Sequence, residues 1–356
     1  MDGTSASPDR LNAQQRSAHI REVVLAKGVE LRERYPLLKH QDALGAGILA
    51  FALIGMVGSA VLYINGHLAW WACLLLNAFL ASLTHELEHD LIHSMYFRKQ
   101  RVPHNLMLGL VWLARPSTIN PWIRRHLHLN HHKVSGTETD MEERAITNGE
   151  PWGFARLLMV GDNVMSAFIR MLRAKTWAHK INIIKRTLKV YAPLALVHWG
   201  AWYVFLGFHA INAVAYLAGA SVQWSDTTLA VMQVIDIAAV VIIGPNVLRT
   251  FCLHFVSSNM HYYGDVEPGN VIQQTQVLNP WWLWPLQAFC CNFGSTHGIH
   301  HFVVKEPFYI RQLTVPFAHR VMREMGVRFN DFGTFARANR WTRRAQAQTS
   351  ERTQAA

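Results

Sequence analysis

Residues 84–94 read THELEHDLIHS and place histidines at positions 85, 89 and 93, directly after an apolar run. On an α-helix, four residues make one turn plus about 40°, so the three side chains form one stripe along the helix. The letters HELEH also fit the H-E-x-x-H pattern, in which two histidines bind zinc and the glutamate is a general base. The other histidines of the chain bear on which interpretation applies.

Ten of the 20 histidines fall into four clusters. Beyond the first stripe, HLHLNHH (126–132) and HGIHH (297–301) each contain an H-x-x-H-H pattern, and SSNMHYYGD (257–265) adds His261. In H-x-x-H-H the first histidine lies one helical turn below the following pair, so each triplet converges on one region. Imidazole is a good ligand for iron, zinc and copper. Eight to ten such ligands exceed what one ion uses, and the sequence therefore predicts two metal ions.

The composition is typical of a membrane protein. Hydrophobic residues make up 51% of the 356 residues and charged residues 16%, against about 25% charged in soluble domains. Each of four apolar segments approaches the ~20 residues that cross a bilayer core. These predicted spans are 43–65, 68–84, 191–208 and 228–250. We therefore expect an all-α integral membrane protein with about four transmembrane helices.

The basic residues predict the orientation of these helices. If the spans pair as two hairpins, their connecting loops are 66–67 and 209–227, and neither contains Lys or Arg. The positive-inside rule then places both termini, the long middle segment and all four histidine clusters on the cytoplasmic side. The net charge of +11 is thus explained by basic residues that orient the helices in the membrane and contact anionic lipid. Nucleic-acid binding is not expected.

Three regions are expected along the chain. Residues 1–42 form a cytoplasmic segment with amphipathic helical spacing, 43–341 form a single membrane-bound domain, and the polar residues 342–356 form a disordered tail. The apolar stretch 104–116 is too short to span and is expected to cover a core or to lie at the interface. The four cysteines lack the spacing of an iron–sulfur or tetrathiolate zinc site.

The histidine boxes in this order resemble the membrane-bound di-iron fatty acid desaturase superfamily, with its hydroxylase and alkane-oxidising relatives. The resemblance rests on H-x-x-x-H at 85–89, H-x-x-H-H at 128–132 and 297–301, and an H-x-x-G element at 261–264. It implies transmembrane helices beneath a helical cytoplasmic cap that holds two non-heme irons, in a bacterial inner membrane. The iron ligands that it implies are His85, His89, His128, His131, His132, His261, His297, His300 and His301.

Further residues have expected roles near this centre. His93 continues the first stripe and His126 adjoins the second box, so either is a ligand or lies close behind one. Ser257 stands where stearoyl-type relatives have asparagine. The acids expected to orient imidazole N–H groups are Glu86, Glu88, Asp90, Asp140 and Asp265. Arg124 and Arg125 are candidates for binding a substrate carboxylate, with lipid-facing positive charge as the alternative.

The resemblance implies O2-dependent oxidation of an unactivated C–H bond in a fatty acyl chain, with desaturation as the family default. Oxidative decarboxylation of free fatty acids to terminal alkenes, and hydroxylation, are close alternatives. Electrons are expected from separate proteins, a ferredoxin and its reductase. Two other classes of protein explain less of the histidine pattern. A membrane zinc protease leaves both H-x-x-H-H triplets without a role. A metal transporter predicts histidines along the spans, and only His198 lies well inside one.

Overall fold

A computed structural model describes residues 11–147 and 149–342 of the chain. The described residues form helices joined by short connections and contain no β-strand, only two isolated bridges, His261 with Thr275 and Val277 with Phe329. The predicted all-α class is therefore confirmed. The predicted disordered tail lies outside the described residues from residue 343 onward.

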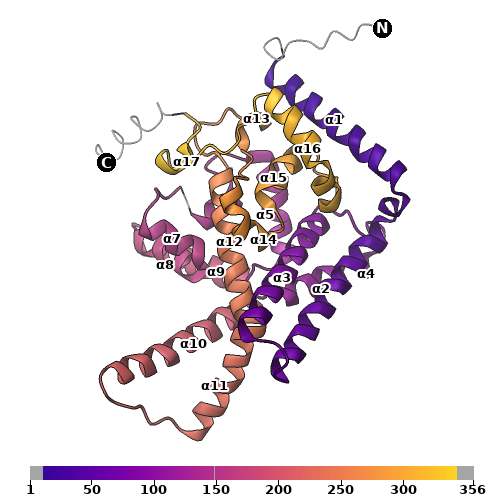
Figure 1. Ribbon diagram of the computed structural model, residues 1–356. Helices are drawn as coiled ribbons and strands as arrows, with labels where there is room; N and C mark the ends of the chain where they lie inside the picture. The colour runs from indigo at the N-terminus through magenta and orange to yellow at the C-terminus, as the bar shows by residue number, and fades with distance from the viewer. Residues whose placement is uncertain (1–10, 148, 343–356) are drawn as a thin grey trace, which may run out of the picture.

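Three helices of the described chain are long and apolar enough to cross a membrane. They are α2 (Gln41–Ile64), α10 (Leu194–Leu217) and a continuous run, Asp226–Met260. That run consists of α11 (Asp226–Ala238), a π-helical segment (Ala239–Ile243) and α12 (Gly244–Met260). These helices correspond to the first, third and fourth predicted spans, although α10 continues about two turns beyond the predicted end. Figure 1 shows α10 and α11 extending away from the main body.

The second predicted span, 68–84, is the first part of a longer helix, α3 (Trp70–Ile92). Its N-terminal part is apolar and partly exposed, whereas every residue from Thr84 to Ile92 is buried. Because charged residues follow its apolar part directly, α3 is not one of the three helices that are long and apolar enough to cross a membrane. The helix runs beside α2 and carries the histidine stripe into the interior of the cap (Figure 1).

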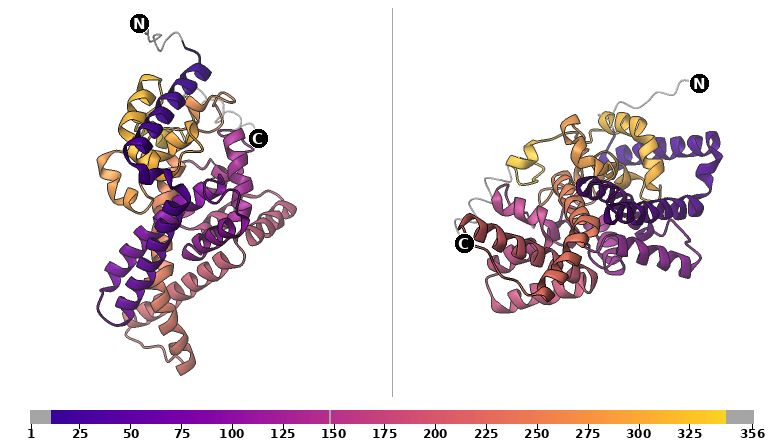
Figure 2. Two further views of the ribbon diagram at one scale, coloured as in Figure 1. Left: turned by 90° about the vertical axis from the view of Figure 1, so that its right-hand side faces the viewer. Right: turned by 60° about the horizontal axis from the view of Figure 1, so that its bottom comes forward.

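The cap is built from both ends of the chain. Helix α1 (Ala13–Arg34), in the segment with predicted amphipathic spacing, packs along α16 (Phe308–Glu324) and next to α15 (Phe293–Phe302). Figures 1 and 2 both show α1 and α16 side by side. Their shared core is apolar and comprises Ile20, Val24, Ile299, Phe302, Val321 and Met322 with their neighbours. The N-terminal segment thereby covers the helix that carries the third histidine box.

The remaining helices close the cap around α3. Helix α4 (Arg101–Ala114), from the stretch predicted as too short to span, packs Met107, Leu108 and Val111 against Leu87 and Leu91 of α3. Helix α5 (Pro121–Val134) begins at the N-cap Asn120 and carries the second histidine box. The other short elements are η2 (Pro36–Lys39), α6 (Met141–Ile146), α7 (Phe154–Gly161), α8 (Asn163–Arg173), α9 (Trp177–Tyr191), α13 (Val271–Gln274), η4 (Trp281–Leu283), α14 (Trp284–Ala288) and α17 (Gly333–Ala336).

Candidate metal centre

Eight histidines form two groups of four in the cap. In each group one ring nitrogen per residue lies within 4.8 Å of the other three, which is the spacing of ligands around one ion. The first group is His89, His93, His128 and His300, and the second group is His131, His261, His297 and His301. His132 adjoins the first group, because its Nε2 lies 3.1 Å from that of His128 and 2.9 Å from that of His300.

Helix geometry explains how each H-x-x-H-H box serves both groups. Residues i and i+4 point the same way, whereas i+3 lies about 60° to the other side of i. In the third box, His297 and His301 accordingly join the second group, and His300 joins the first. In the second box, His128 and His132 point to the first group and His131 to the second. Two helices of the same pattern thus supply ligands to two neighbouring positions.

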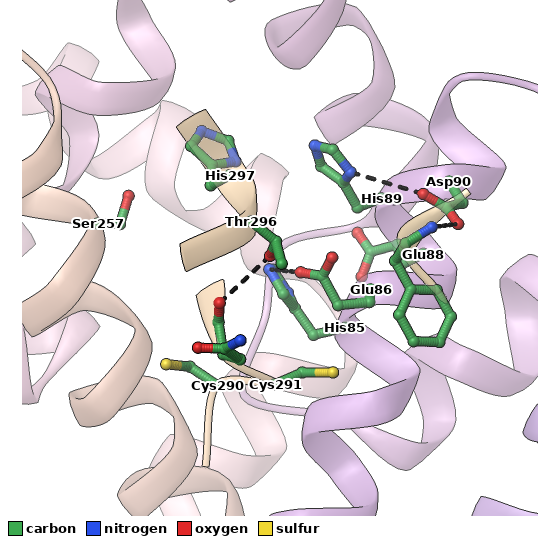
Figure 3. Close-up of polar contacts among 12 residues, drawn as sticks. His85, Glu86, Glu88, His89, Asp90, Ser257, Cys290, Cys291, Thr296 and His297 are labelled. Atoms are coloured by element: carbon green, nitrogen blue, oxygen red, sulfur yellow. Dashed lines mark hydrogen bonds and ion pairs between the residues drawn. The ribbon is translucent and has the colours of Figure 1, made fainter. Parts of the chain in front are cut away.

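The first box differs from the sequence-based prediction. His85 lies in neither group, and its Nδ1 instead accepts a hydrogen bond from Nη1 of Arg115 at 3.3 Å. One turn further along α3, His89 and His93 each place a ring nitrogen in the first group. Figure 3 shows His85 below His89 and His297 in this view, next to Glu86. The arrangement does not fit a zinc protease, because His85 and His89 do not share a group.

Two carboxylates in the sequence DMEE (140–143) orient imidazoles from behind, and a third, Glu143, lies near His261, whose Nδ1 is hydrogen-bonded to the backbone carbonyl of Ser257. Asp140 accepts from Nδ1 of His131 at 2.7 Å, Glu142 accepts from Nδ1 of His128 at 2.7 Å, and Glu143 lies 3.2 Å from Nδ1 of His261. An imidazole whose Nδ1–H is held by a carboxylate presents Nε2 to a metal. Sequence reasoning named Asp140 and missed both glutamates, although a run of acids soon after the second box was a usable signal.

The acids of α3 have a different role from the predicted one. Glu86 and Asp90 both bind the guanidinium of Arg311, at 3.2 and 2.9 Å, and Asp90 also accepts from the backbone N–H of Phe308 at 2.9 Å. Figure 3 shows His89 next to Asp90, but Nδ1 of His89 is 4.0 Å from the Asp90 carboxylate, too far for a hydrogen bond. These carboxylates therefore tie α3 to α16 and do not orient the imidazoles.

Glu88 likewise forms ion pairs, with Arg115 and with Arg124, whose Nη1 is 3.2 Å from the carboxylate. Arg124 also lies 3.4 Å from Glu142, so this predicted carboxylate-binding residue already pairs with two acids. The other predicted residue, Arg125, donates to Ser94 Oγ at 2.5 Å.

Three further residues named from the sequence lie outside the two groups. Ser257 donates to Glu143 at 3.4 Å and so supports the contact of that acid with His261. His126 is exposed on α5. Asp265 differs from its expected role, because it accepts from the backbone N–H groups of Trp341 and Thr342 and fixes the C-terminal segment.

The histidines fit metal ions by burial and protonation. Burial lowers the pKa of His93 to about 3 and that of His132 to about 2, so both rings are neutral at pH 7, as a ligand must be. Burial also lowers the pKa of His131, but the hydrogen bond to Asp140 and the negative charges of Asp140, Glu142 and Glu143 together outweigh burial and raise the pKa to about 9, so a metal ion bound there would have to displace that proton. Both ring nitrogens of His89 and Nε2 of His131 are buried without a hydrogen-bond partner. Ligation of a metal would satisfy one of these nitrogens on each ring, and a polar atom is costly to bury without a partner.

A cavity of about 120 Å³ lies beside the groups. It is lined by histidines of both groups, by His85, and by apolar residues that include Leu127, Leu253 and Phe293. A second cavity, of about 660 Å³, lies between α5, α8 and α9. The two cavities share a wall formed by Ile119, Leu127, Ala145 and Tyr191.

Helices able to cross a membrane, joined to a cap with two four-histidine groups and an adjoining apolar cavity, define the class of membrane proteins with a candidate histidine-rich metal centre. The family model for fatty acid desaturase matches residues 65–333, a range that contains every histidine of both groups. The chain therefore belongs to the fatty acid desaturase family and is a membrane-associated oxidoreductase with a fatty acyl substrate. No curated protein matches this chain.

Proposed function

We propose that the protein catalyses O2-dependent oxidation of an unactivated C–H bond in a fatty acyl chain, with one non-heme iron ion in each histidine group. The observation that carries this proposal is the pair of adjacent four-histidine groups. Neutral imidazole is a suitable ligand for iron, and two such groups suit a pair of ions. Two iron ions bound there would supply the reductive activation of O2.

The residues of the chain support this chemistry by position. Asp140 and Glu142 hold the imidazoles of His131 and His128 in the orientation that presents Nε2. The apolar side chains of Leu253 and Phe293 give the adjoining cavity a surface suited to methylene groups. Desaturation removes one hydrogen from each of two neighbouring carbons, while O2 takes up two electrons and two protons and leaves as two water molecules.

The site also accommodates the two alternatives, because they differ in the carbon that lies next to the histidines. Hydroxylation adds one oxygen atom to that carbon. Oxidative decarboxylation removes a hydrogen from C3 of a carboxylate and breaks the C1–C2 bond. C2 and C3 become a terminal double bond, CO2 leaves, and O2, two electrons and three protons give two waters. In every case the electrons come from an external donor, for which we propose a ferredoxin and its reductase.

The location that fits this function is a bacterial inner membrane with the cap in the cytoplasm. There the cap meets reduced electron carriers, and the exposed apolar faces of α2 and α10 lie in lipid. Lysine and arginine are absent from the connection between α10 and α11, which supports the same orientation.

The test is to purify the protein in detergent, measure bound iron and zinc, and supply reduced ferredoxin and dodecanoic acid with and without O2. We expect two iron ions per chain and oxidised products only with O2, resolved by gas chromatography and mass spectrometry. Zinc as the bound metal, or turnover without O2, would refute the proposal.

A further inference from the structure

Arg249 is a buried cation at the inner end of an apolar run. It lies on α12, within the helical run Asp226–Met260, and its exposed fraction is 1%. An ionisable side chain in such a place is costly unless a partner compensates its charge, and it commonly marks a functional site. Its partner is therefore of interest.

No acidic side chain of the described residues pairs with Arg249. Its Nε donates to Asn246 Oδ1 at 3.4 Å, and its Nη2 lies 3.3 Å from Ser117 Oγ and 3.2 Å from Thr250 Oγ1. These neutral oxygens fix the guanidinium in place but do not balance its charge. Nη1 is buried and has no hydrogen-bond partner in the described part of the chain.

Two other buried arginines show the contrasting case. Arg115 pairs with Glu88, and Arg311 pairs with Glu86 and Asp90, so each has a carboxylate of α3 beside it. Arg124 lines the same cavity as Arg249, but its guanidinium already pairs with Glu88 and Glu142. Arg249 therefore differs from all three in offering an uncompensated charge to the cavity.

The cavity itself indicates the ligand. Arg249 lines it together with Thr250, with histidines of both metal groups, and with the apolar side chains of Leu253 and Phe293. A fixed guanidinium beside a largely apolar cavity complements a molecule with one anionic head and a hydrocarbon chain. A carboxylate is the anion that a guanidinium binds with two parallel hydrogen bonds.

We propose that Arg249 binds the carboxylate of a free fatty acid, which enters the cavity head first. This inference rests on the proposed function for the identity of the substrate as a fatty acyl compound. The carbons nearest the carboxylate then lie beside the histidine groups, and oxidation falls at the carboxyl end of the chain. The hydrocarbon tail then points toward the larger cavity, which shares Leu127 and Tyr191 with the first.

The opposite orientation makes a distinct prediction. Arg186 and Lys189 are exposed on α9 and line the larger cavity. If the head group were bound there, the methyl end of the chain would point toward the histidines. These two residues therefore provide the matched control for Arg249.

The test is equilibrium binding of radiolabelled dodecanoic acid and dodecan-1-ol to the full chain in nanodiscs, with and without bound iron. We compare wild type, Arg249→Gln, Arg249→Lys and the double variant Arg186→Gln/Lys189→Gln. Arg249→Gln should weaken binding of the acid at least about tenfold and leave binding of the alcohol unchanged. The affinity of Arg249→Lys for the acid should lie between those of wild type and Arg249→Gln. The double variant should bind the acid as tightly as wild type does. Acid binding within about twofold of wild type in Arg249→Gln, or its loss in the double variant instead, would overturn the proposal.

Two further measurements keep the test decisive. Thermal unfolding and iron content report whether Arg249→Gln folds. If this variant does not fold, the affinities of wild type for the acid and the alcohol are compared instead. Equal affinities for the two would contradict the role of Arg249. Products of wild type oxidised within the first few carbons support head-first binding, whereas mid-chain products refute it. The proposed oxidase function fails if iron is absent or if turnover does not need O2. Binding of the acid to metal-free protein depends on neither result, so it tests the role of Arg249 separately.

Discussion

At the scale of single residues, the position of the stripe along α3 decides which histidines can be ligands. His93 contacts His128 with its Nε2 at 3.0 Å, whereas His85 contacts Arg115. We predict that His93→Ala loses the metal of the first group, about half of the bound iron, and that His85→Ala retains both ions. Metal analysis of the purified variants measures this.

His126→Ala is the control for these variants, because His126 lies exposed on α5, outside both groups. It should bind as much iron as wild type. If His85→Ala lost as much iron as His93→Ala, the first box would begin at His85, as the sequence resemblance implies.

The carboxylates behind the histidines give a second prediction. Glu142→Gln removes the charge that holds Nδ1–H of His128, and we expect the affinity of the first group for iron to fall about 10–100-fold. Competition with a chelator measures the affinity. Glu138→Gln, an exposed position two residues before Asp140, should leave it unchanged. Equal affinity in both variants would show that Glu142 does not orient the ligand.

These residues show where sequence reasoning reaches its limit. The sequence predicted that each H-x-x-H-H triplet converges on one region, whereas the structure divides each triplet between two adjacent groups, as the angle between i, i+3 and i+4 allows. The choice between His85 and His93 was not predictable, since both lie on one stripe and only the packing of α3 against α5 and α15 selects the turn. Arg311, which binds two acids of α3, is 221 residues from Asp90 and has no local signal.

At the scale of helices, α3 is joined to α16 by that arginine. Burial raises the pKa of Glu86 to about 7 and of Asp90 to about 6, although Arg311 opposes both shifts. Arg311→Met would leave these two carboxylates buried without their cation, and we expect the free energy of unfolding to fall by about 3–5 kcal/mol. Chemical unfolding in mixed micelles measures the change.

Arg320→Met on the same helix is the control, because Arg320 is exposed and pairs with no acid in the described residues. It should unfold within about 0.5 kcal/mol of wild type. A loss of similar size in both variants would mean that α16 is sensitive to any change of charge.

The helices also show why boundaries were harder to predict than the presence of elements. Apolar composition identified the first, third and fourth spans, because length and hydropathy alone define a segment that can cross a bilayer. The second predicted span ends at residue 84, where polar residues begin, although the histidine spacing of 85–93 allowed the helix to continue beyond it. The helix continues to Ile92 because Arg311 and Arg115 compensate the acids of its buried half.

At the scale of the whole molecule, charge and apolar surface lie at opposite ends. Val57, Val197 and Val214, on α2 and α10, are all more than half exposed, as expected for side chains that face lipid. The histidine groups and their acids lie in the cap, which Figure 2 shows gathered at the other end of these helices. The molecule therefore has one end with an exposed apolar surface and one end formed by the cap.

The proposed orientation requires an even number of crossings, and labelling of introduced cysteines tests it. We predict that Gln14→Cys, exposed on α1, is protected from a membrane-impermeant maleimide in intact cells and reacts after lysis. Ser221→Cys, exposed between α10 and α11, should react in intact cells. Wild type is the control, because three of its four cysteines are buried and Cys291 is partly buried.

If α3 does not cross and the other three helices do, the N-terminal segment lies on the opposite side from the cap. Reaction of Gln14→Cys in intact cells would then contradict the four-helix arrangement, and it would separate α1 from α16, against which it packs.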